Sequence, residues 1–249
     1  MRIAIDAGHG PETAGKRTPD GTLREFHFNS KVAAYARSGF EKYEAVDIKF
    51  VHAEDGSRDV PLKERTDKAN AWGAGVYISI HANAHGNGWN QAEGIETYVH
   101  TRPSTGSLRL AEAVHRQLIR QTGRRDRGVK TANFQVLRET KMPSILVECG
   151  FMTNREEAGL LKSDSYRRQC AAAIVAGTAE VYGLKLKPGG GEGVSGFKDV
   201  PKDHWAAGAI KKAVEAGIMN GISNEQFGLG QPVTREQLAV ILDRLGLLK

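Results

Sequence analysis

The sequence predicts an α/β domain with a mostly parallel twisted sheet flanked by helices, followed by a small, mainly α-helical module. Two observations support this fold class: short β-rich runs alternate with longer helical patterns through residues 1–187, and only helical patterns follow a glycine-rich stretch near the end. The chain has 249 residues, 40% of them hydrophobic, which is enough for one sizeable core and a smaller second unit. This composition excludes a chain that is disordered throughout or fibrous.

The predicted strands and helices of the first domain alternate along the chain. Strands are expected at 2–6, 47–52, 76–81, 94–100 and 143–149, and helices at 25–42, 62–72, 108–121 and 166–182. The last helix has one continuous face, because Tyr166, Cys170, Ile174, Gly177 and Val181 recur at steps of three and four. Cys170 is therefore expected in the core.

A flexible linker is predicted at residues 188–196, where the composition collapses to glycine and small residues. It separates a domain at 1–187 from a module at 197–249. Helices are expected within the module at 204–216 and 234–245. The second helix begins with Thr234 and has Gln237 three residues later, which is typical of a capping box.

The charge is distributed unevenly between the two parts. The net charge is +6, and the seven basic and seven acidic residues after position 191 cancel, so the whole excess lies in the first 191 residues. A basic body indicates a polyanionic partner such as nucleic acid, anionic lipid or a wall polymer. No run approaches the ~18 apolar residues that a membrane span needs, so we expect no membrane insertion. The two cysteines form neither a disulfide framework nor a CxxC pair.

Three polar side chains stand at or near the ends of predicted strands. They are His9, His81 and Glu148. In an open α/β sheet, functional groups gather beyond the carboxyl ends of the strands, so these residues are expected in one crevice. Two imidazoles and carboxylates are suited to a catalytic zinc ion, which commonly takes three protein ligands and leaves a position for water. Spacing alone leaves the third ligand open among Glu25, His27, His85 and Glu96.

These segments resemble the zinc-dependent N-acetylmuramoyl-L-alanine amidases of the amidase-3 family, in their order and in their positions at strand ends. The resemblance covers nearly all of residues 1–182. It rests on the segments around His9, Glu25, His81 and Glu148, on Arg65 and Asn70, on Gly94-Ile95-Glu96-Thr97-Tyr98, on Val136-Leu137-Arg138 with Met142-Pro143, and on Glu148-Cys149-Gly150-Phe151-Met152-Thr153-Asn154.

The resemblance implies a peptidoglycan hydrolase that cuts the amide bond between N-acetylmuramic acid and L-alanine. It makes His9, Glu25 and His81 the ligands of a Zn²⁺ cofactor and Glu148 the catalytic carboxylate. Zinc would polarise the carbonyl and lower the pKa of its bound water, while Glu148 takes the proton and returns it to the leaving nitrogen. Asp6 is expected to orient an imidazole of the metal site.

Three further residues are candidates for support of the metal site or for substrate contact: Arg65, Asn83 and His85.

Other functions remain open at this point. Cys149 with His81 as its base would make a thiol hydrolase, although Cys149 is equally well a small buried hydrophobe. A zinc peptidase acting on another stem-peptide bond would share the metal chemistry. A non-catalytic, wall-anchored surface protein would keep the fold, but it has no chemical need of both Glu25 and Glu148.

The C-terminal module resembles one S-layer homology repeat. The resemblance rests on Phe197-Lys198-Asp199-Val200, His204-Trp205-Ala206 and Val233-Thr234-Arg235-Glu236-Gln237-Leu238-Ala239. It implies binding of an anionic secondary polymer of the cell wall, although the family usually carries three repeats. The alternative is a small packing or dimerisation appendage.

Two further observations bear on partners and location. The basic cluster at 124–127 is interpreted as a solvated turn, because no aromatic residues are interleaved to stack bases, so no nucleic acid partner is expected. No charged-then-apolar leader precedes the first strand. We therefore expect an enzyme made in the cytoplasm that reaches the wall through a holin-type pore or on lysis, as a phage endolysin does, with a sporulation-type lytic amidase as the alternative.

Overall fold

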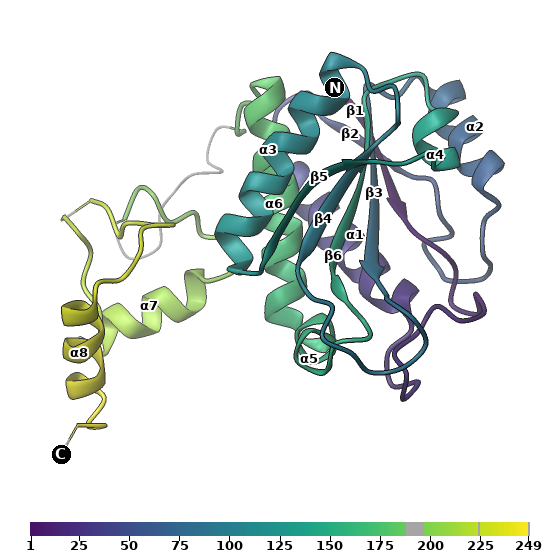
Figure 1. Cartoon of the computed structure of the whole chain (residues 1–249). Coiled ribbons are helices and arrows are strands. Elements are labelled where there is room, and N and C mark those ends of the chain that lie inside the picture. The colour runs from purple at the N-terminus through teal and green to yellow at the C-terminus, as the bar shows by residue number, and fades with distance from the viewer. Residues whose placement is uncertain (188–196, 224, 249) are drawn as a thin grey trace. The chain divides into compact units, whose positions relative to one another are not determined.

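The computed structural model describes residues 1–187, 197–223 and 225–248. The chain forms two compact units, Met1–Lys185 and Leu186–Lys249 (Figure 1). The predicted linker at 188–196 lies outside the described residues. None of the described helices is long and apolar enough to cross a membrane.

The first unit is built on a six-stranded sheet with the order β2-β1-β3-β6-β4-β5. Its strands are β1 (Arg2–Ala7), β2 (Asp47–Phe50), β3 (Val76–Asn83), β4 (Ile95–Val99), β5 (Asp126–Thr131) and β6 (Ser144–Phe151). All neighbouring strands pair in parallel except β4 and β6, which are antiparallel. The predicted mostly parallel sheet is therefore confirmed.

Helices cover both faces of this sheet (Figure 1). They are α1 (Glu25–Phe40), α2 (Leu62–Trp72), α3 (Thr105–Thr122), α4 (Gln135–Arg138), α5 (Arg155–Lys162) and α6 (Asp164–Tyr182). Alternate residues of β1 point to opposite faces, so Ile3 and Ile5 belong to the core on the side of α1, α3 and α6, whereas Ala4 belongs to the core on the side of α2 and α4. Both faces of the sheet are buried, and the sequences of its central strands are therefore continuous apolar runs.

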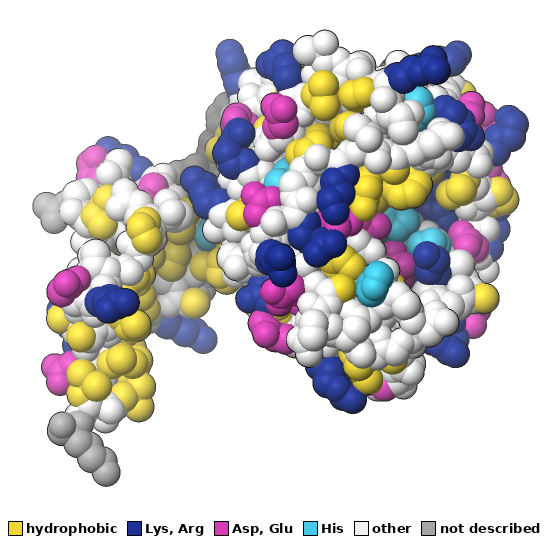
Figure 2. Space-filling view, viewed as in Figure 1, with side chains coloured by type: hydrophobic (Ala, Val, Ile, Leu, Met, Phe, Trp, Pro, Cys, Tyr) yellow, Lys and Arg dark blue, Asp and Glu magenta, His cyan; other side chains and the backbone are white. Residues whose placement is uncertain are grey.

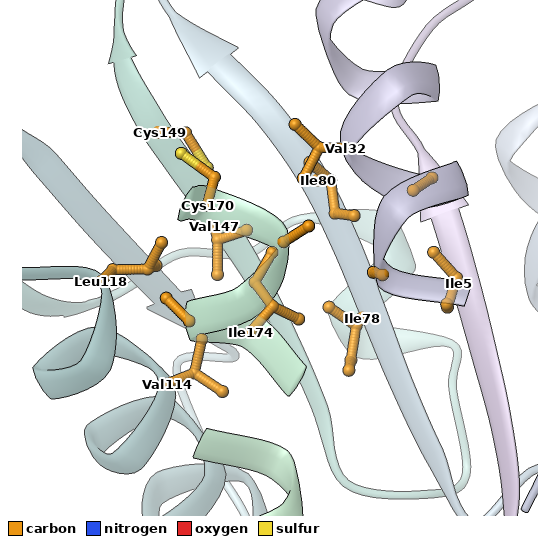
Figure 3. Close-up of a cluster of buried hydrophobic side chains, with 14 of the residues drawn as sticks. Ile5, Val32, Ile78, Ile80, Val114, Leu118, Val147, Cys149, Cys170 and Ile174 are labelled. Atoms are coloured by element: carbon orange, nitrogen blue, oxygen red, sulfur yellow. The ribbon is translucent and has the colours of Figure 1, made fainter. Parts of the chain in front are cut away.

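The larger core lies between the sheet and the helices α1, α3 and α6. Figure 3 shows Ile78 and Val147 of the strands facing Cys170 and Ile174 of α6. Cys170 is fully buried, as predicted. Helices α3 and α6 approach closely at Gly177, where an added Cβ would lie 2.6 Å from the Cα atom of Val114.

Three elements were not predicted: β5, α4 and α5. The interpretation of 124–127 as a solvated turn is wrong for Asp126 and Arg127, which begin β5. The Arg124 Nη1 lies 2.7 Å from Glu156 Oε1, and Arg127 Nε lies 2.6 Å from Glu96 Oε1. The strand is at the edge of the sheet and carries no apolar alternation, so periodicity does not reveal it.

The second unit contains α7 (Ala207–Glu215) and α8 (Arg235–Arg244). Its small core consists of Phe197 and Val200 with Ala207 and Ile210 of α7. The Asp199 carboxylate accepts three hydrogen bonds from the backbone N–H groups of 227–229. The predicted capping box of α8 is confirmed, because Thr234 and Gln237 exchange both hydrogen bonds. No residue of α8 is buried.

Candidate metal centre

The structure brings His9, Glu25 and His81 together, with their ligand atoms all within 4.8 Å of one another. Glu25 Oε1 lies 2.9 Å from His81 Nδ1, and Glu25 Oε2 lies 3.3 Å from His9 Nε2. The two imidazole rings are nearly perpendicular, with centroids 5.0 Å apart. Two imidazole nitrogens and one carboxylate are a donor set that zinc accepts in catalytic sites, so these residues fit the metal that the sequence resemblance implies.

Each candidate ligand is placed by a different element. His9 follows β1 in a left-handed conformation with φ 65°, which a non-glycine residue seldom adopts. His81 lies on β3, and Glu25 is the first residue of α1, where a carboxylate is favoured by the helix dipole. The approach is possible only because residue 8 is glycine, since an added Cβ would lie 2.0 Å from the His81 ring.

Arg65 holds the turn that carries His9. Its side chain is fully buried. Its Nη1 donates to the Ala7 carbonyl oxygen at 2.6 Å, and its Nη2 donates to the His9 carbonyl oxygen at 2.7 Å and to Asp59 at 2.9 Å. These contacts fix the backbone on both sides of the unusual φ angle.

Asp6 was expected to orient an imidazole, and the structure gives it other partners. Its carboxylate accepts hydrogen bonds from Arg65 at 2.5 Å, Tyr77 at 2.9 Å and Ser79 at 2.8 Å. Burial opposes ionisation, but the charge of Arg65 and its hydrogen bond lower the pKa of Asp6 below the usual value. Asp6 therefore acts on the site through Arg65, because its position on the strand directs it to the α2 side of the sheet.

Asn29 is a site residue that the sequence analysis missed. It lies one helical turn after Glu25 on α1 and is fully buried. Its Nδ2 donates to the Gly8 carbonyl oxygen at 3.0 Å and to Glu25 Oε1 at 3.3 Å. The spacing of four residues from a candidate ligand was the available signal, because such residues share one helix face.

Glu148 is flanked by a polar residue on each of the two neighbouring strands. On β6 it is the cross-strand partner of His81 on β3 and of Glu96 on β4. Its Oε2 is shielded from solvent and has no hydrogen-bond partner among the described residues. Burial, with the nearby charges of Glu25 and Glu96, raises the pKa of Glu148 to about 8 against the opposing effect of His81. A carboxyl group in this state can exchange protons near neutral pH.

His9, His81 and Glu148 line a cavity of about 570 Å³. Leu62 on α2 and Phe134 just before α4 line the same cavity with partly exposed apolar side chains. Figure 2 shows histidine and acidic side chains in a hollow on this face, bordered by apolar and basic side chains. The cavity is therefore polar at its centre and has apolar walls, as ligand pockets commonly are.

The other predicted site residues lie outside the metal group. Asn83 donates from Nδ2 to Glu96 Oε2 at 3.0 Å. The His85 side chain is exposed at the same edge of the sheet, where its backbone N–H donates to Thr153. Of the alternative third ligands, His27 is exposed and Glu96 is engaged by basic residues of β5.

Cys149 is not placed for nucleophilic chemistry. It is fully buried in the core, on the opposite face of β6 from Glu148, next to Cys170 (Figure 3). A hydrogen bond with Cys170, followed by burial, raises the pKa of the Cys149 thiol well above its usual range. The alternative of a thiol hydrolase is therefore wrong, because a nucleophilic cysteine needs an accessible thiolate.

Two histidines and a glutamate gather at the carboxyl edge of a mostly parallel sheet, beside a buried carboxyl oxygen that has no hydrogen-bond partner among the described residues. This arrangement is typical of metal-dependent hydrolases. Sequence comparison narrows this class. The family model Amidase_3, N-acetylmuramoyl-L-alanine amidase, matches residues 3–180, and the chain belongs to this family. The model of the S-layer homology domain matches residues 196–239.

Relatives and solved structures agree with this assignment. The chain is 34% identical over 185 residues to the N-acetylmuramoyl-L-alanine amidase CwlM of Bacillus licheniformis, covering 74% of this chain and 70% of the relative. It is 34% identical over 194 residues to the endolysin of Bacillus phage SPP1, covering 76% and 68%. The crystal structure of an N-acetylmuramoyl-L-alanine amidase from Clostridium difficile 630 superposes with a TM-score of 0.69 at 34% identity, covering 73% of this chain and 96% of that one.

Proposed function

We propose that this protein hydrolyses the amide bond between N-acetylmuramic acid and L-alanine in peptidoglycan, with a zinc ion held by His9, Glu25 and His81. The observation that carries the proposal is the grouping of these three residues beside a cavity that His9 and His81 line together with Glu148, in a chain of the amidase family. A zinc ion bound there supplies a Lewis acid for the carbonyl oxygen and lowers the pKa of a coordinated water.

The proton transfers fall to Glu148. Its Oε2 has no other hydrogen-bond partner among the described residues, so it is free to accept the proton of the attacking water. The raised pKa lets the same oxygen donate that proton to the departing alanine nitrogen. Glu148 thereby serves as base and then as acid.

The remaining site residues position the ligands. Asn29 holds Glu25 against the Gly8 carbonyl, and Arg65 holds the His9 turn. Partners of this kind orient metal ligands and contribute to metal affinity. This positioning role accounts for the buried polar residues that surround the three proposed ligands.

We also propose that the second unit attaches the enzyme to the wall. The S-layer homology match supports binding of an anionic secondary wall polymer. The endolysin among the relatives supports action on the wall after release from the producing cell. A single repeat that serves instead for packing or dimerisation is the alternative.

Product analysis tests the enzymatic proposal. Purified walls digested with the protein should gain L-alanine amino termini without gaining reducing sugars. A chelator should abolish the signal, added zinc should restore it, and a thiol-blocking reagent should leave it unchanged. New amino termini of another residue would instead indicate a zinc peptidase. No new termini with the zinc-loaded protein would indicate a non-catalytic wall protein.

A further inference from the structure

A second cavity of about 370 Å³ lies in the first unit, apart from the metal group. One wall is the segment 100–107, which joins β4 to α3 and begins that helix. The other wall is the segment 137–144, which runs from the end of α4 to the start of β6. We refer to the cavity between these two segments as the basic pocket.

The described lining of the basic pocket is cationic and rich in hydroxyl groups. Arg102, Arg138 and Lys141 line it, and no described lining residue is an aspartate or a glutamate. Its hydroxyl groups come from Ser104, Ser107, Thr140 and Ser144. Guanidinium and ammonium groups are donors that proteins use for carboxylate and phosphate oxygens, whereas the Thr140 and Ser144 hydroxyls already donate to the carbonyl oxygens of Val136 and Leu137.

Two of these cations have no counter-charge within the described part of the chain. The side chains of Arg102 and Lys141 are exposed and make no ion pair there, whereas Arg138 Nε lies 2.8 Å from Glu139 Oε1. The basic cluster at 124–127 differs, because Arg124 and Arg127 are paired with glutamates. The basic pocket therefore offers cations that an external anion can engage without displacing an internal partner.

The basic pocket and the cavity of the metal centre are lined by nearby residues of the same two elements. On α4, Val136 lines the metal-centre cavity and Leu137 lines the basic pocket. On β6, Ser144 lines the basic pocket and Glu148 lines the metal-centre cavity. Four residues of a strand span ~13 Å, which is also the length of about four residues of an extended peptide.

We propose that the basic pocket binds an anionic oxygen group of the wall polymer whose amide bond lies at Glu148. This inference rests on the proposed function for the identity of the polymer. The anion is a carboxylate of the stem peptide or a phosphate of an attached wall polymer, since both present the same oxygen chemistry at this distance. Arg102 and Lys141 make the contact, and they act on binding of the substrate and not on the chemical step.

Direct binding tests the pocket independently of catalysis. Inorganic phosphate and acetate are titrated separately into the full chain while backbone amide NMR signals are followed. The signals of 102–107 and 140–144 should shift, and the double variant Arg102→Gln/Lys141→Gln should weaken this binding at least 5-fold. The matched control Lys31→Gln/Arg120→Gln removes two exposed cations elsewhere and should bind as the wild type does. Equal binding by all three proteins overturns the proposal.

Kinetics then identify the source of the anion. On intact walls the double variant should show a KM raised about 3- to 10-fold with an unchanged kcat. If the effect persists on walls stripped of phosphate polymer but vanishes on walls that keep this polymer and have amidated stem-peptide carboxylates, the ligand is a stem-peptide carboxylate. The reverse pattern identifies a phosphate. An unchanged KM on every substrate overturns the proposal, whereas anion binding without any amidase activity would refute only the proposed function.

Discussion

Glu96 on β4 is the direct cross-strand partner of Glu148 on β6. The two carboxylates have opposite surroundings. Burial opposes ionisation of Glu96, but hydrogen bonds from Lys130, Tyr98 and Arg127 lower its pKa to about 2. Glu148 has no such donors among the residues that the structure describes, and burial raises its pKa to about 8. A fixed negative charge thus lies beside a carboxyl group that must hold and release a proton, which is how paired carboxylates acquire separate roles.

The first prediction concerns Glu148 itself. Glu148→Gln keeps the volume of the side chain but removes its proton transfer, so kcat should fall by ~10²–10⁴-fold. Zinc content and thermal stability should match the wild type, because Glu148 is outside the ligand group. Amino-terminus release from walls and metal analysis of the same preparation measure both effects. Retention of more than a tenth of the activity would remove Glu148 from the mechanism.

The second prediction concerns pH. Glu96→Gln removes a negative charge that raises the pKa of Glu148, so that pKa should fall. The limb of the pH–rate profile that reports Glu148 should therefore move toward lower pH. Glu156→Gln removes a carboxylate that pairs with Arg124, and it should leave the profile in place. A profile that does not move in Glu96→Gln, or that moves equally in both variants, contradicts this role.

The third prediction concerns metal affinity. Arg65→Lys keeps the buried charge but cannot reproduce the hydrogen bonds to Ala7, His9 and Asp59. The His9 turn should loosen, and zinc affinity should fall ~10- to 100-fold. Competition with a chelating dye measures this loss. The control Arg116→Lys alters an exposed ion pair with Glu180, and it should bind zinc as the wild type does. Equal affinity in both variants would mean that the turn holds its shape without Arg65.

The sequence predicted the parts of the site that depend on strand ends. His9, His81 and Glu148 follow from the rule that functional groups gather at the carboxyl edge of a parallel sheet. Glu25 required the family resemblance, because a carboxylate at the start of a helix has no distinctive spacing. The role of Asp6 was not predictable, because its partners Arg65, Tyr77 and Ser79 come from other elements.

The limits of the fold prediction have a similar cause. The strands at the centre of the sheet are apolar on both faces and are visible in the sequence. The edge strand β5 pairs with a neighbour on one side only and exposes charged residues, so its sequence resembles that of a turn. Asn29 was missed because a buried amide on a helix is recognised only when its neighbours Gly8 and Glu25 are placed beside it.

The fourth prediction concerns stability and acid. The lowered pKa of Asp6 means that its ionised form stabilises the folded state. This contribution is present above the ordinary value of 3.8 and is lost as pH falls through the lower pKa of the folded protein.

Asp6→Asn leaves Arg65 buried without its partner, so the free energy of unfolding at pH 7 should fall by ~3–5 kcal/mol. Denaturant unfolding from pH 7 to pH 3 should show this difference shrinking at the acid end. Asp67→Asn, at an exposed pair with Lys63, should leave the free energy of unfolding nearly unchanged at every pH.

The fifth prediction separates the two units. The first unit has its own sheet and core, so a chain ending at residue 187 should fold and hydrolyse soluble muropeptides at the wild-type rate. The second unit has only a small core and α8 has no buried residues, which is consistent with α8 providing a surface that binds a partner. Sedimentation with purified walls should therefore fall several-fold on truncation. The remaining binding should weaken with added salt, because the net positive charge lies in the first 191 residues. Undiminished sedimentation of the truncated chain would assign wall binding to the first unit alone and leave the second unit as a packing or dimerisation appendage.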